Sequence, residues 1–352
     1  MCSGGGGSIE PKRDIDLFLI EKKKQDVYLG FCEENLRRVF SFPHIFGKWR
    51  FLNKFWKRRV LKNPSLINRF ITEQYDVNIG FLEGISTIYI SQKQGGKKIG
   101  YIHTSLKEIR NNTRDERELE AYLKLDMLVC VSHYVKDSLL ALYPELATKR
   151  IEVVYNPVNK DSILSRAQEC TPHKERFTFL QVGRLTEQKG LKTLLEANAL
   201  LQNEGLEYDI WLLGEGARYQ GELEAMIQAQ GVSNVRFLGF HTNPYPYIKA
   251  CDCMLLASYY EGYGLVLAEA CVLGRAIIAS DIPTSKEVLC DERGEASALL
   301  FPSKDACTLA TQMREVYHNA PLRKTLESKA LKRAESFSLS TAAMRLEQIL
   351  KE

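Results

Sequence analysis

Short apolar runs alternate with amphipathic segments through the second half of the chain. Each run has the length of a strand that is buried on both faces, and the segment from Leu191 to Ala199 has the leucine spacing of a helix that stops before Gly205. Strands that alternate with helices predict parallel strands joined by right-handed crossovers, and therefore a doubly wound sheet. The predicted strands are Phe177–Val182, Tyr208–Leu213, Val235–Leu238, Cys253–Ala257, Ala276–Ala279 and Ala298–Phe301.

The same alternation of apolar runs and amphipathic segments is present, less clearly, in the first half of the chain. Because 352 residues exceed what one hydrophobic core usually supports, two α/β domains in tandem are expected. The polar stretch from Lys160 to Arg176, which has no clear periodicity, is the predicted linker. The first half holds predicted strands at Ile15–Ile20, Asp76–Phe81, Lys98–Ile102, Met127–Val131 and Ile151–Tyr155, and predicted helices at Glu108–Lys124 and Tyr134–Leu142.

The composition, with 45% apolar and 26% charged residues, excludes disordered and collagen-like classes. The nine cysteines include no Cys-x-x-Cys pair and several lie in apolar runs, so we expect them to be reduced, buried and structural, which favours a cytoplasmic protein. No apolar run approaches about 18 residues and no signal-peptide pattern opens the chain, so neither a membrane span nor secretion is expected.

Candidate chemistry lies where predicted strands pass into helices. Ligands bind there in doubly wound sheets, because helix N-termini offer free N–H groups to phosphates. At the first joint, Gly183 is followed by Arg184 and Lys189, two cations that could share a diphosphate or could be ordinary surface charges. At the second, Gly214 and Gly216 form a Gly-x-Gly turn that, taken alone, is more simply a tight turn.

The third joint holds two carboxylates eight residues apart. Glu261 lies in a glycine-rich loop, and Glu269 lies about two turns into the predicted helix that follows. Backbone N–H groups around Tyr263, Gly264 and Leu265 would point at a phosphate. A glutamate on an otherwise apolar helix is costly unless it has partners, so Glu269 is predicted to accept from two adjacent ribose hydroxyls.

The Glu261–Glu269 segment resembles the Glu, seven residues, Glu motif of the family 4 (group 1) retaining glycosyltransferases of the GT-B fold. That family also has a Gly-Arg-x-x-x-x-Lys-Gly element similar to residues 183–190, a glycine pair similar to Gly214 and Gly216, and a Val-x-Phe-Leu-Gly run similar to Val235–Gly239. The resemblance extends over about residues 177–340, with the family's order and spacing throughout.

This resemblance implies that Arg184 and Lys189 hold the diphosphate of a nucleotide-sugar donor. It also implies that Glu269 binds the ribose and that Glu261, with the backbone after it, contacts the transferred sugar. Because the two cations offset charge on the leaving group, no metal and no cofactor are expected. The donor-binding set is then Gly183, Gly214, Gly216, Phe240, Gly262, Tyr263, Gly264, Leu265 and Glu269.

In the first half, His103 ends a predicted strand at the place where similar enzymes have an inter-domain active-site histidine. A lone histidine is more often a surface or core residue, but its place after a strand favours function. We therefore count His103 with Glu261, Arg184 and Lys189 as catalytic candidates.

The family pattern also sets the expected domains. Residues 1–165 are predicted to form an acceptor-side Rossmann-like domain, residues 166–335 the nucleotide-sugar-binding domain, and residues 336–352 a helix that crosses back to the first domain. The family's usual first strand and first helix are expected to be missing or replaced, because the Gly-rich start runs almost directly into the strand at Ile15.

The stretch from Asn35 to Thr72 contains ten basic and no acidic residues, interleaved with aromatic ones such as Trp49 and Trp56. Basic amphipathic segments of this kind favour contact with an anionic membrane surface. An ordinary solvated helix is the simpler alternative, although such helices usually carry both signs of charge. Nucleic acid is not an expected partner, because the basic set lies on one predicted helix without a recognised motif.

Together with these patterns, the resemblance to the family implies a GT-B enzyme of the α/β class, with two doubly wound Rossmann-like domains facing across a cleft. It would transfer a hexose with retention from a nucleotide sugar, with UDP favoured because it is common in the family, to a lipid-linked or polysaccharide acceptor. The setting would be bacterial surface-glycan synthesis, in the cytoplasm or on the inner face of the membrane. The alternatives are a non-catalytic or truncated nucleotide-sugar-binding protein and a GT-B sugar-nucleotide epimerase.

Overall fold

The computed structural model describes residues 13–19, 32, 34, 36–41, 59–60, 62–69 and 71–352. The chain forms two compact units, residues 1–74 and residues 75–352. The predicted domain boundary at residue 165 therefore stays a prediction, as does the predicted loss of a first strand, which falls largely on residues outside the described ranges.

The first unit contains a parallel pair of strands, β1 (Arg13–Leu19) and β2 (Leu36–Ser41), and a 3-10 helix, η1 (Pro64–Arg69). Arg37 and Arg38 both bind the carboxylate of Asp16, at 2.7 and 2.8 Å, and Glu73 also pairs with Arg38 at 2.8 Å. Because residues 36–41 form strand β2, the prediction that the basic stretch is one helix is wrong for this part. Residues 42–58 of that stretch lie outside the described residues.

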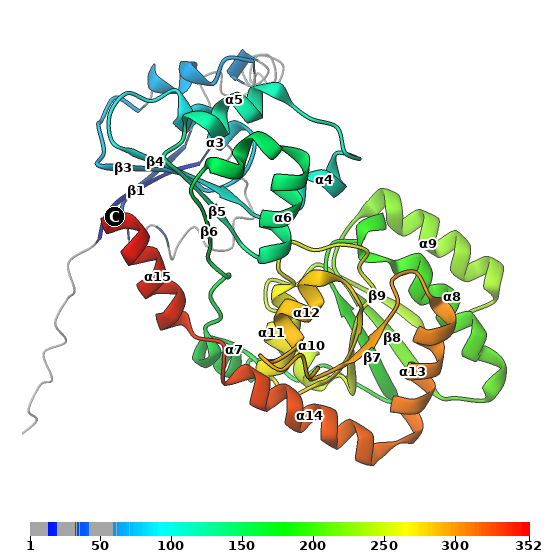
Figure 1. The fold of residues 1–352 in the computed structure, drawn as a ribbon. Helices are drawn as coiled ribbons and strands as arrows, with labels where there is room; N and C mark the ends of the chain where they lie inside the picture. The colour runs from blue at the N-terminus through cyan, green and yellow to red at the C-terminus, as the bar shows by residue number, and fades with distance from the viewer. Residues whose placement is uncertain are drawn as a thin grey trace, which may run out of the picture. The chain divides into compact units, whose positions relative to one another are not determined.

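A four-stranded parallel sheet opens the second unit, with the strands in chain order: β3 (Val77–Gly80), β4 (Lys97–Ile102), β5 (Met127–Cys130) and β6 (Ile151–Val153). Its helices are α3 (Ile85–Ser91), α4 (Leu106–Ile109), α5 (Glu116–Lys124) and α6 (His133–Leu142), and η2 is Pro144–Thr148. The last helix of the chain, α15 (Leu339–Lys351), packs Ile349 against Ile99, Met127 and Val129 of this sheet (Figure 1). Helix α15 is therefore part of the core around the four-stranded sheet.

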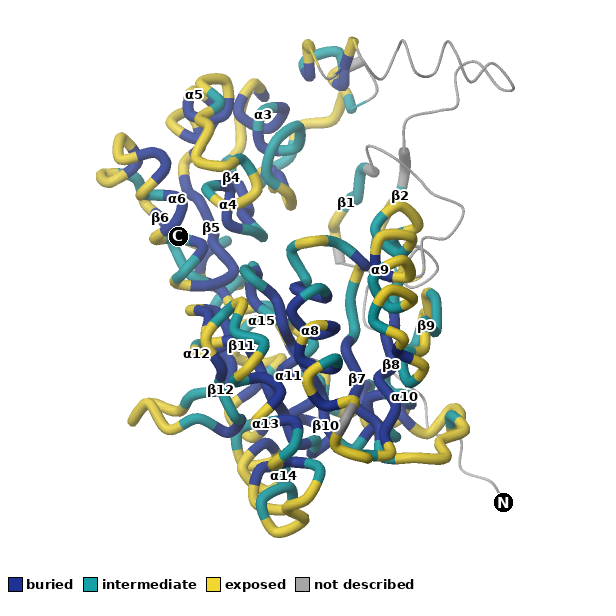
Figure 2. Tube along the Cα trace, turned by 90° about the vertical axis from the view of Figure 1, so that its right-hand side faces the viewer, coloured by how far each residue is buried: buried dark blue, intermediate teal, exposed yellow. Residues whose placement is uncertain are grey.

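A six-stranded parallel sheet forms the rest of the second unit, in the order β12-β11-β10-β7-β8-β9. All six strands predicted for the second half are present, and the central ones are buried (Figure 2). The strands are β7 (Phe177–Val182), β8 (Tyr208–Leu213), β9 (Val235–Gly239), β10 (Cys253–Leu256), β11 (Ala276–Ser280) and β12 (Leu299–Phe301).

Helices cover this larger sheet, and α8 and α13 pack together while α11 packs against α14. Buried Phe179, Ile210 and Leu255 of the strands share one core with Leu194 and Met313 of the helices. The helices are α7 (Lys160–Arg166), α8 (Leu191–Leu201), α9 (Ala217–Gln230), α10 (Tyr245–Ala250), α11 (Leu265–Val272), α12 (Pro283–Leu289), α13 (Ala306–His318) and α14 (Ala320–Ala334), with short 3-10 turns η3 (Glu187–Lys189) and η4 (Gln202–Glu204).

One further sequence prediction of local structure is wrong. The helix predicted over Glu108–Lys124 is broken between α4 and α5, because Asn111 and Asn112 take positive φ angles of 46° and 61°, which asparagine tolerates. Asp115 then caps α5 by accepting from the N–H of Arg117. The predicted linker from Lys160 begins as helix α7, which Asn159 caps by accepting from the N–H of Ser162.

The described cysteines are all free thiols, but not all of them are buried. Cys130, Cys251, Cys253 and Cys271 lie in the core as predicted, whereas Cys170 and Cys307 are exposed, which corrects the expectation for these two. None of the helices in the described ranges combines the length and the apolar composition that a membrane span requires.

Candidate active site

The candidate site lies where the order of the larger sheet reverses. From β7 the chain adds β8 and β9 on one side, and it then adds β10, β11 and β12 on the other side. The loops that leave β7 and β10 therefore diverge from neighbouring strands, which is the place where open α/β sheets bind ligands. The first loop carries Gly183, Arg184 and Lys189, and the second carries Glu261.

Lys189 and Glu261 are paired across these two loops. The ammonium Nζ of Lys189 donates to Oε1 of Glu261 at 2.6 Å, and both side chains are largely buried, at 15% and 10% exposure. The hydroxyl of Ser258 donates to the same carboxylate oxygen at 2.7 Å. The motif assigned these two residues to different parts of a donor, but the structure brings them into one hydrogen-bonded cluster. An ammonium has three N–H donors, so Lys189 still has two for a phosphate oxygen.

Two glutamine side chains fasten the loops to each other. Gln181 donates from Nε2 to the carbonyl of Lys189 at 2.6 Å and accepts from the N–H of Ala257 at 3.3 Å. Gln188 donates from Nε2 to the carbonyl of Tyr260 at 2.8 Å. Sequence reasoning missed both residues, because an amide side chain in a strand or loop carries no motif of its own.

Glycines let the loops after β7 and β8 lie against each other. A Cβ on Gly214 would come within 1.9 Å of the Gly183 carbonyl oxygen, and a Cβ on Gly216 would come within 2.0 Å of the Leu185 carbonyl oxygen. Gly183 and Gly214 also have positive φ angles of 149° and 152°. The glycine pair is therefore needed for packing, whatever else it binds.

Arg184 stands apart from this packed core. Its side chain is exposed, and the described residues provide no hydrogen bond or ion pair to its guanidinium. Its charge lies near the phenol of Tyr260, whose pKa burial raises. Five N–H donors are thus available for a ligand at the mouth of the site.

Glu269 lies on α11, between apolar neighbours that face the core. Leu267, Ala268 and Ala270 are fully buried, while the hydroxyl of Tyr245 on α10 donates to the Glu269 carboxylate at 3.3 Å. Burial raises the pKa of this carboxyl, and the Tyr245 hydrogen bond opposes the shift. A single long hydrogen bond leaves acceptor capacity on Glu269 for further donors.

The remaining donor-binding candidates differ in whether their side chains are exposed or buried. Gly264, with φ of 79°, precedes α11, whose first turn has no side-chain cap, and Leu265 is 40% exposed beside it. The ring of Tyr263 instead points inward and stacks on Tyr155 with centroids 5.2 Å apart, and burial raises its pKa to about 12. Phe240 is 51% exposed after β9.

His103 follows β4 in a small aromatic stack. Its imidazole packs against both Phe81 and Tyr101, with centroids 4.9 and 5.7 Å away, and its main-chain N–H donates to Glu83 at 2.9 Å. Burial lowers the pKa of His103, against the opposing charge of Glu83, so the ring is neutral at pH 7. Its Nε2 atom is buried and has no partner among the described residues, so it can bond to a ligand.

Gly262 brings the loop of Glu261 to His103. A Cβ at Gly262 would lie 1.9 Å from the His103 carbonyl oxygen, so the two main chains are in contact. The hydroxyl of Ser132, which follows β5, donates to the Gly262 carbonyl at 2.7 Å. The smaller sheet and the larger sheet thus meet at the residue next to Glu261.

Replacing Gly262 with alanine should therefore disturb this contact. The added methyl overlaps main-chain atoms that cannot rotate away, so we expect a loss of about 1–3 kcal/mol of stability, together with slower turnover. Gly221→Ala is the matched control, because Gly221 faces open space in the middle of α9 and alanine favours helices. Thermal unfolding of both variants tests this, and equal melting temperatures would contradict it.

Among the residues that the structure describes, no group of three or more His, Cys, Asp or Glu side chains is arranged to hold a metal ion.

The fold is that of GT-B glycosyltransferases, and comparisons with known proteins agree. Residues 166–333 match the model of the glycosyl transferases group 1, and residues 23–162 match that of glycosyltransferase family 4. The chain belongs to this family of glycosyltransferases.

Individual relatives are distant. The chain is 28% identical over 218 residues, 61% of its length, to an N-acetylgalactosaminyltransferase of Campylobacter jejuni that acts on N-acetylgalactosamine-N,N'-diacetylbacillosaminyl-diphospho-undecaprenol, and the match spans 57% of that enzyme. It is 24% identical to an uncharacterised glycosyltransferase of Methanocaldococcus jannaschii, over 97% of this chain and 91% of the relative. Among solved structures, HepE of Anabaena in complex with UDP and glucose has a TM-score of 0.71 at 18% identity, covering 96% of this chain and 91% of HepE.

Proposed function

We propose that the chain is a retaining, metal-independent hexosyltransferase that uses a nucleotide-sugar donor, with UDP as the favoured carrier. The observation that carries the proposal is the Lys189–Glu261 pair at the reversal point of the larger sheet, at 2.6 Å, in the same loop as the exposed Arg184, whose guanidinium has no partner among the described residues. Arg184 and Lys189 would hold the diphosphate and offset the charge that develops on it as the sugar leaves. UDP is favoured further because HepE is described with it.

The roles of the carboxylates follow from their surroundings. Glu261 is fixed by Lys189 and Ser258 next to His103, so it would contact the sugar being transferred. Glu269 has acceptor capacity on a helix that is otherwise apolar, which suits the two ribose hydroxyls. The neutral imidazole of His103 would bond to a hydroxyl of the sugar through Nε2.

For the acceptor, we propose a lipid-linked or polysaccharide glycan of bacterial surface-glycan synthesis. The support is the Campylobacter relative, whose name gives an undecaprenol-linked acceptor. A protein at this step would work in the cytoplasm, close to the inner face of the membrane.

A turnover assay with a set of nucleotide sugars, followed by release of free nucleoside diphosphate, tests this function. We expect one or a few donors to release the diphosphate faster when acceptor glycans are present. Donor binding without any release would favour the non-catalytic alternative, and a changed sugar still attached to the nucleotide would favour an epimerase. Full activity only with added divalent metal would overturn metal independence.

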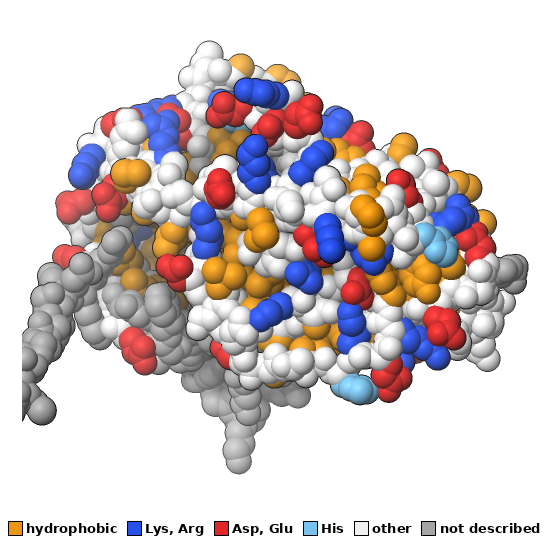
Figure 3. Space-filling view, turned by 90° about the horizontal axis from the view of Figure 1, so that it is seen from below, with side chains coloured by type: hydrophobic (Ala, Val, Ile, Leu, Met, Phe, Trp, Pro, Cys, Tyr) orange, Lys and Arg blue, Asp and Glu red, His pale blue; other side chains and the backbone are white. Residues whose placement is uncertain are grey.

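The basic stretch within residues 35–72 is proposed to contact an anionic membrane surface. Arg37 and Arg38 are already engaged by Asp16, so the other basic residues would carry the attraction. The face of the molecule in Figure 3 offers a contrast, because Lys and Arg side chains are interspersed there with Asp and Glu. Attraction to an anionic membrane would be weaker on that face than at a stretch that carries only positive charges.

Co-sedimentation with vesicles checks this proposal. Binding should rise with phosphatidylglycerol content and fall as salt is raised to about 1 M, where charges are screened beyond about 3 Å. Binding that is independent of salt, or no binding at low salt, would contradict it. Phosphatidylcholine vesicles are the control.

A further inference from the structure

Helix α6 follows strand β5 of the smaller, four-stranded sheet. It is capped at its N-terminus by a carboxylate from the half of the second unit that contains the larger, six-stranded sheet. The two oxygens of Glu287, on α12, accept the main-chain N–H groups of His133 at 2.9 Å and Tyr134 at 2.8 Å. The N–H of Val135 is bound by the hydroxyl of Ser132 at 3.1 Å. The first three N–H groups of α6 are therefore all satisfied, two of them by Glu287.

This contact is favourable for two reasons. A carboxylate at a helix N-terminus lies at the positive end of the helix dipole, and hydrogen bonds from N–H groups to a charged oxygen are stronger than neutral ones. The contact connects two places where a strand passes into a helix, because α6 follows β5 and α12 follows β11. Glu287 thus acts between the two sheets and not within one of them.

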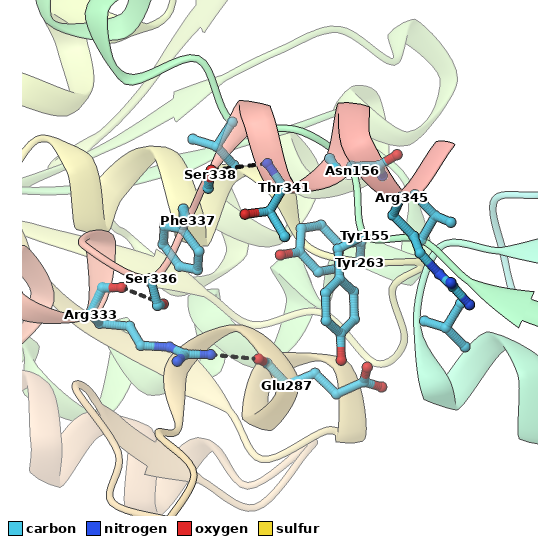
Figure 4. Close-up of a pocket in the computed structure, with 14 residues that line it drawn as sticks. Tyr155, Asn156, Tyr263, Glu287, Arg333, Ser336, Phe337, Ser338, Thr341 and Arg345 are labelled. Atoms are coloured by element: carbon cyan, nitrogen blue, oxygen red, sulfur yellow. Dashed lines mark hydrogen bonds between the residues drawn. The ribbon is translucent and has the colours of Figure 1, made fainter. Parts of the chain in front are cut away.

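The main chain around Glu287 is itself held in place. Arg333, at the end of α14, donates from Nη2 to the Glu287 carbonyl at 3.0 Å and from Nε to the Val288 carbonyl at 2.8 Å (Figure 4). Glu287 and Arg333 border a cavity of about 320 Å³ that is also lined by the stacked rings of Tyr155 and Tyr263. Arg333 therefore presents the Glu287 carboxylate to α6 from a fixed backbone.

The start of α6 is also connected to the candidate active site. Ser132, which caps α6, donates to the carbonyl of Gly262, and Gly262 lies against the carbonyl of His103. Gly262 directly follows Glu261, which contacts Lys189. Among the described residues, Glu287 has no hydrogen bond or ion pair to Glu261, Gly262 or His103, so its effect on them is indirect. It can pass through α6 and Ser132, and also through Tyr155, which contacts Glu287 and stacks on Tyr263.

The geometry points to Glu287 as a positioning residue: by capping α6 from the opposite half, it holds the Glu261 loop against His103 and so keeps the site closed for transfer. This inference rests on the proposed function, because it assigns Glu287 to the alignment of a reaction at Glu261. It assigns Glu287 no contact with the donor, the acceptor or the reacting atoms.

Glu287→Gln tests this role with little change in size. The amide replaces one accepting oxygen with a donor that faces an N–H group, and the negative charge at the helix is lost. We expect kcat to fall by about ten- to a hundred-fold, as for a small misalignment of reacting groups. The dissociation constant of UDP should stay within roughly two-fold of the wild type, because the donor-binding loops of the larger sheet are untouched.

Two further variants separate positioning from general damage. Glu292→Gln removes an exposed carboxylate shortly after α12 that has no bond to α6, and it should behave as the wild type. Glu287→Asp keeps the charge on a shorter side chain and should recover part of the lost kcat. A Glu287→Gln variant with normal kcat would overturn the inference, and so would one whose UDP affinity falls by the same factor as kcat.

Small-angle X-ray scattering provides a readout that does not need turnover. Glu287→Gln should have a larger radius of gyration than the wild type and Glu292→Gln, since the halves separate more often. If the wild type releases no nucleoside diphosphate from any donor, the proposed function fails, and the scattering comparison alone decides whether Glu287 holds the halves together. Identical scattering of all three proteins would overturn the inference.

Discussion

Replacing Arg184 or Lys189 with alanine is expected to lower kcat/KM for the donor by roughly 30- to 1,000-fold. This corresponds to a loss of about 2–4 kcal/mol of transition-state stabilisation, the range for removal of one preorganised group that stabilises developing charge. Steady-state kinetics with saturating acceptor give the measurement. Lys324→Ala is the control, because it removes an exposed cation of α14 that has no ion pair among the described residues.

The two variants should differ in stability, although they share a kinetic defect. Arg184 is exposed and unpaired in the described structure, so its loss should leave the melting temperature almost unchanged. Loss of Lys189 leaves the buried Glu261 carboxylate with only the Ser258 hydroxyl, which should cost about 1–3 kcal/mol of stability. Wild-type kinetics in both variants would rule out the diphosphate assignment.

The second large effect is expected from the two glutamates, which should respond differently to glutamine. Glu269→Gln keeps the size of the side chain but should weaken the hydrogen bonds that we propose it makes to ribose hydroxyls, so the donor's dissociation constant should rise by about ten-fold, or roughly 1.4 kcal/mol. Glu261→Gln should instead reduce kcat more than binding, because we propose that the residue contacts the sugar that moves. Calorimetry with the nucleotide sugar and single-turnover kinetics separate the two effects.

A structural role for the pair would give another pattern. The carboxylate of Glu269 accepts a hydrogen bond of 3.3 Å from Tyr245. If this bond were the whole role of Glu269, Tyr245→Phe should change donor binding and kcat as much as Glu269→Gln does. If both glutamate variants bound the nucleotide sugar and turned over normally, the Glu pair would be structural. The glycosyltransferase proposal would then lose its main support.

The strands of the larger sheet could be predicted from the sequence because each is a short apolar run between turn residues. Phe177–Val182 and Tyr208–Leu213 were predicted with their observed ends. The break after α4 could not be predicted from apolar spacing, because it depends on the positive φ of Asn111 and Asn112 and on the cap by Asp115. Local polar side chains decide such breaks, and apolar periodicity does not record them.

The residues of the candidate site could be predicted as types, but their contacts could not. Lys189 and Glu261 are 72 residues apart and meet because β7 and β10 are neighbours in the sheet. The order of strands along the chain does not state their order in the sheet. Glu287 was missed for a similar reason, since its partners on α6 are more than 150 residues away.

The amide bridges of Gln181 and Gln188 have a mechanical consequence. Both side chains bond to main-chain atoms of the opposite loop, so the segment with Arg184 and Lys189 cannot shift relative to the segment with Glu261 unless those bonds break. The two loops would therefore move as one rigid body. A donor held by them would travel with the larger sheet whenever the halves separate, so release of the nucleotide would depend on local loosening of its own loops and not on the opening of the cleft alone.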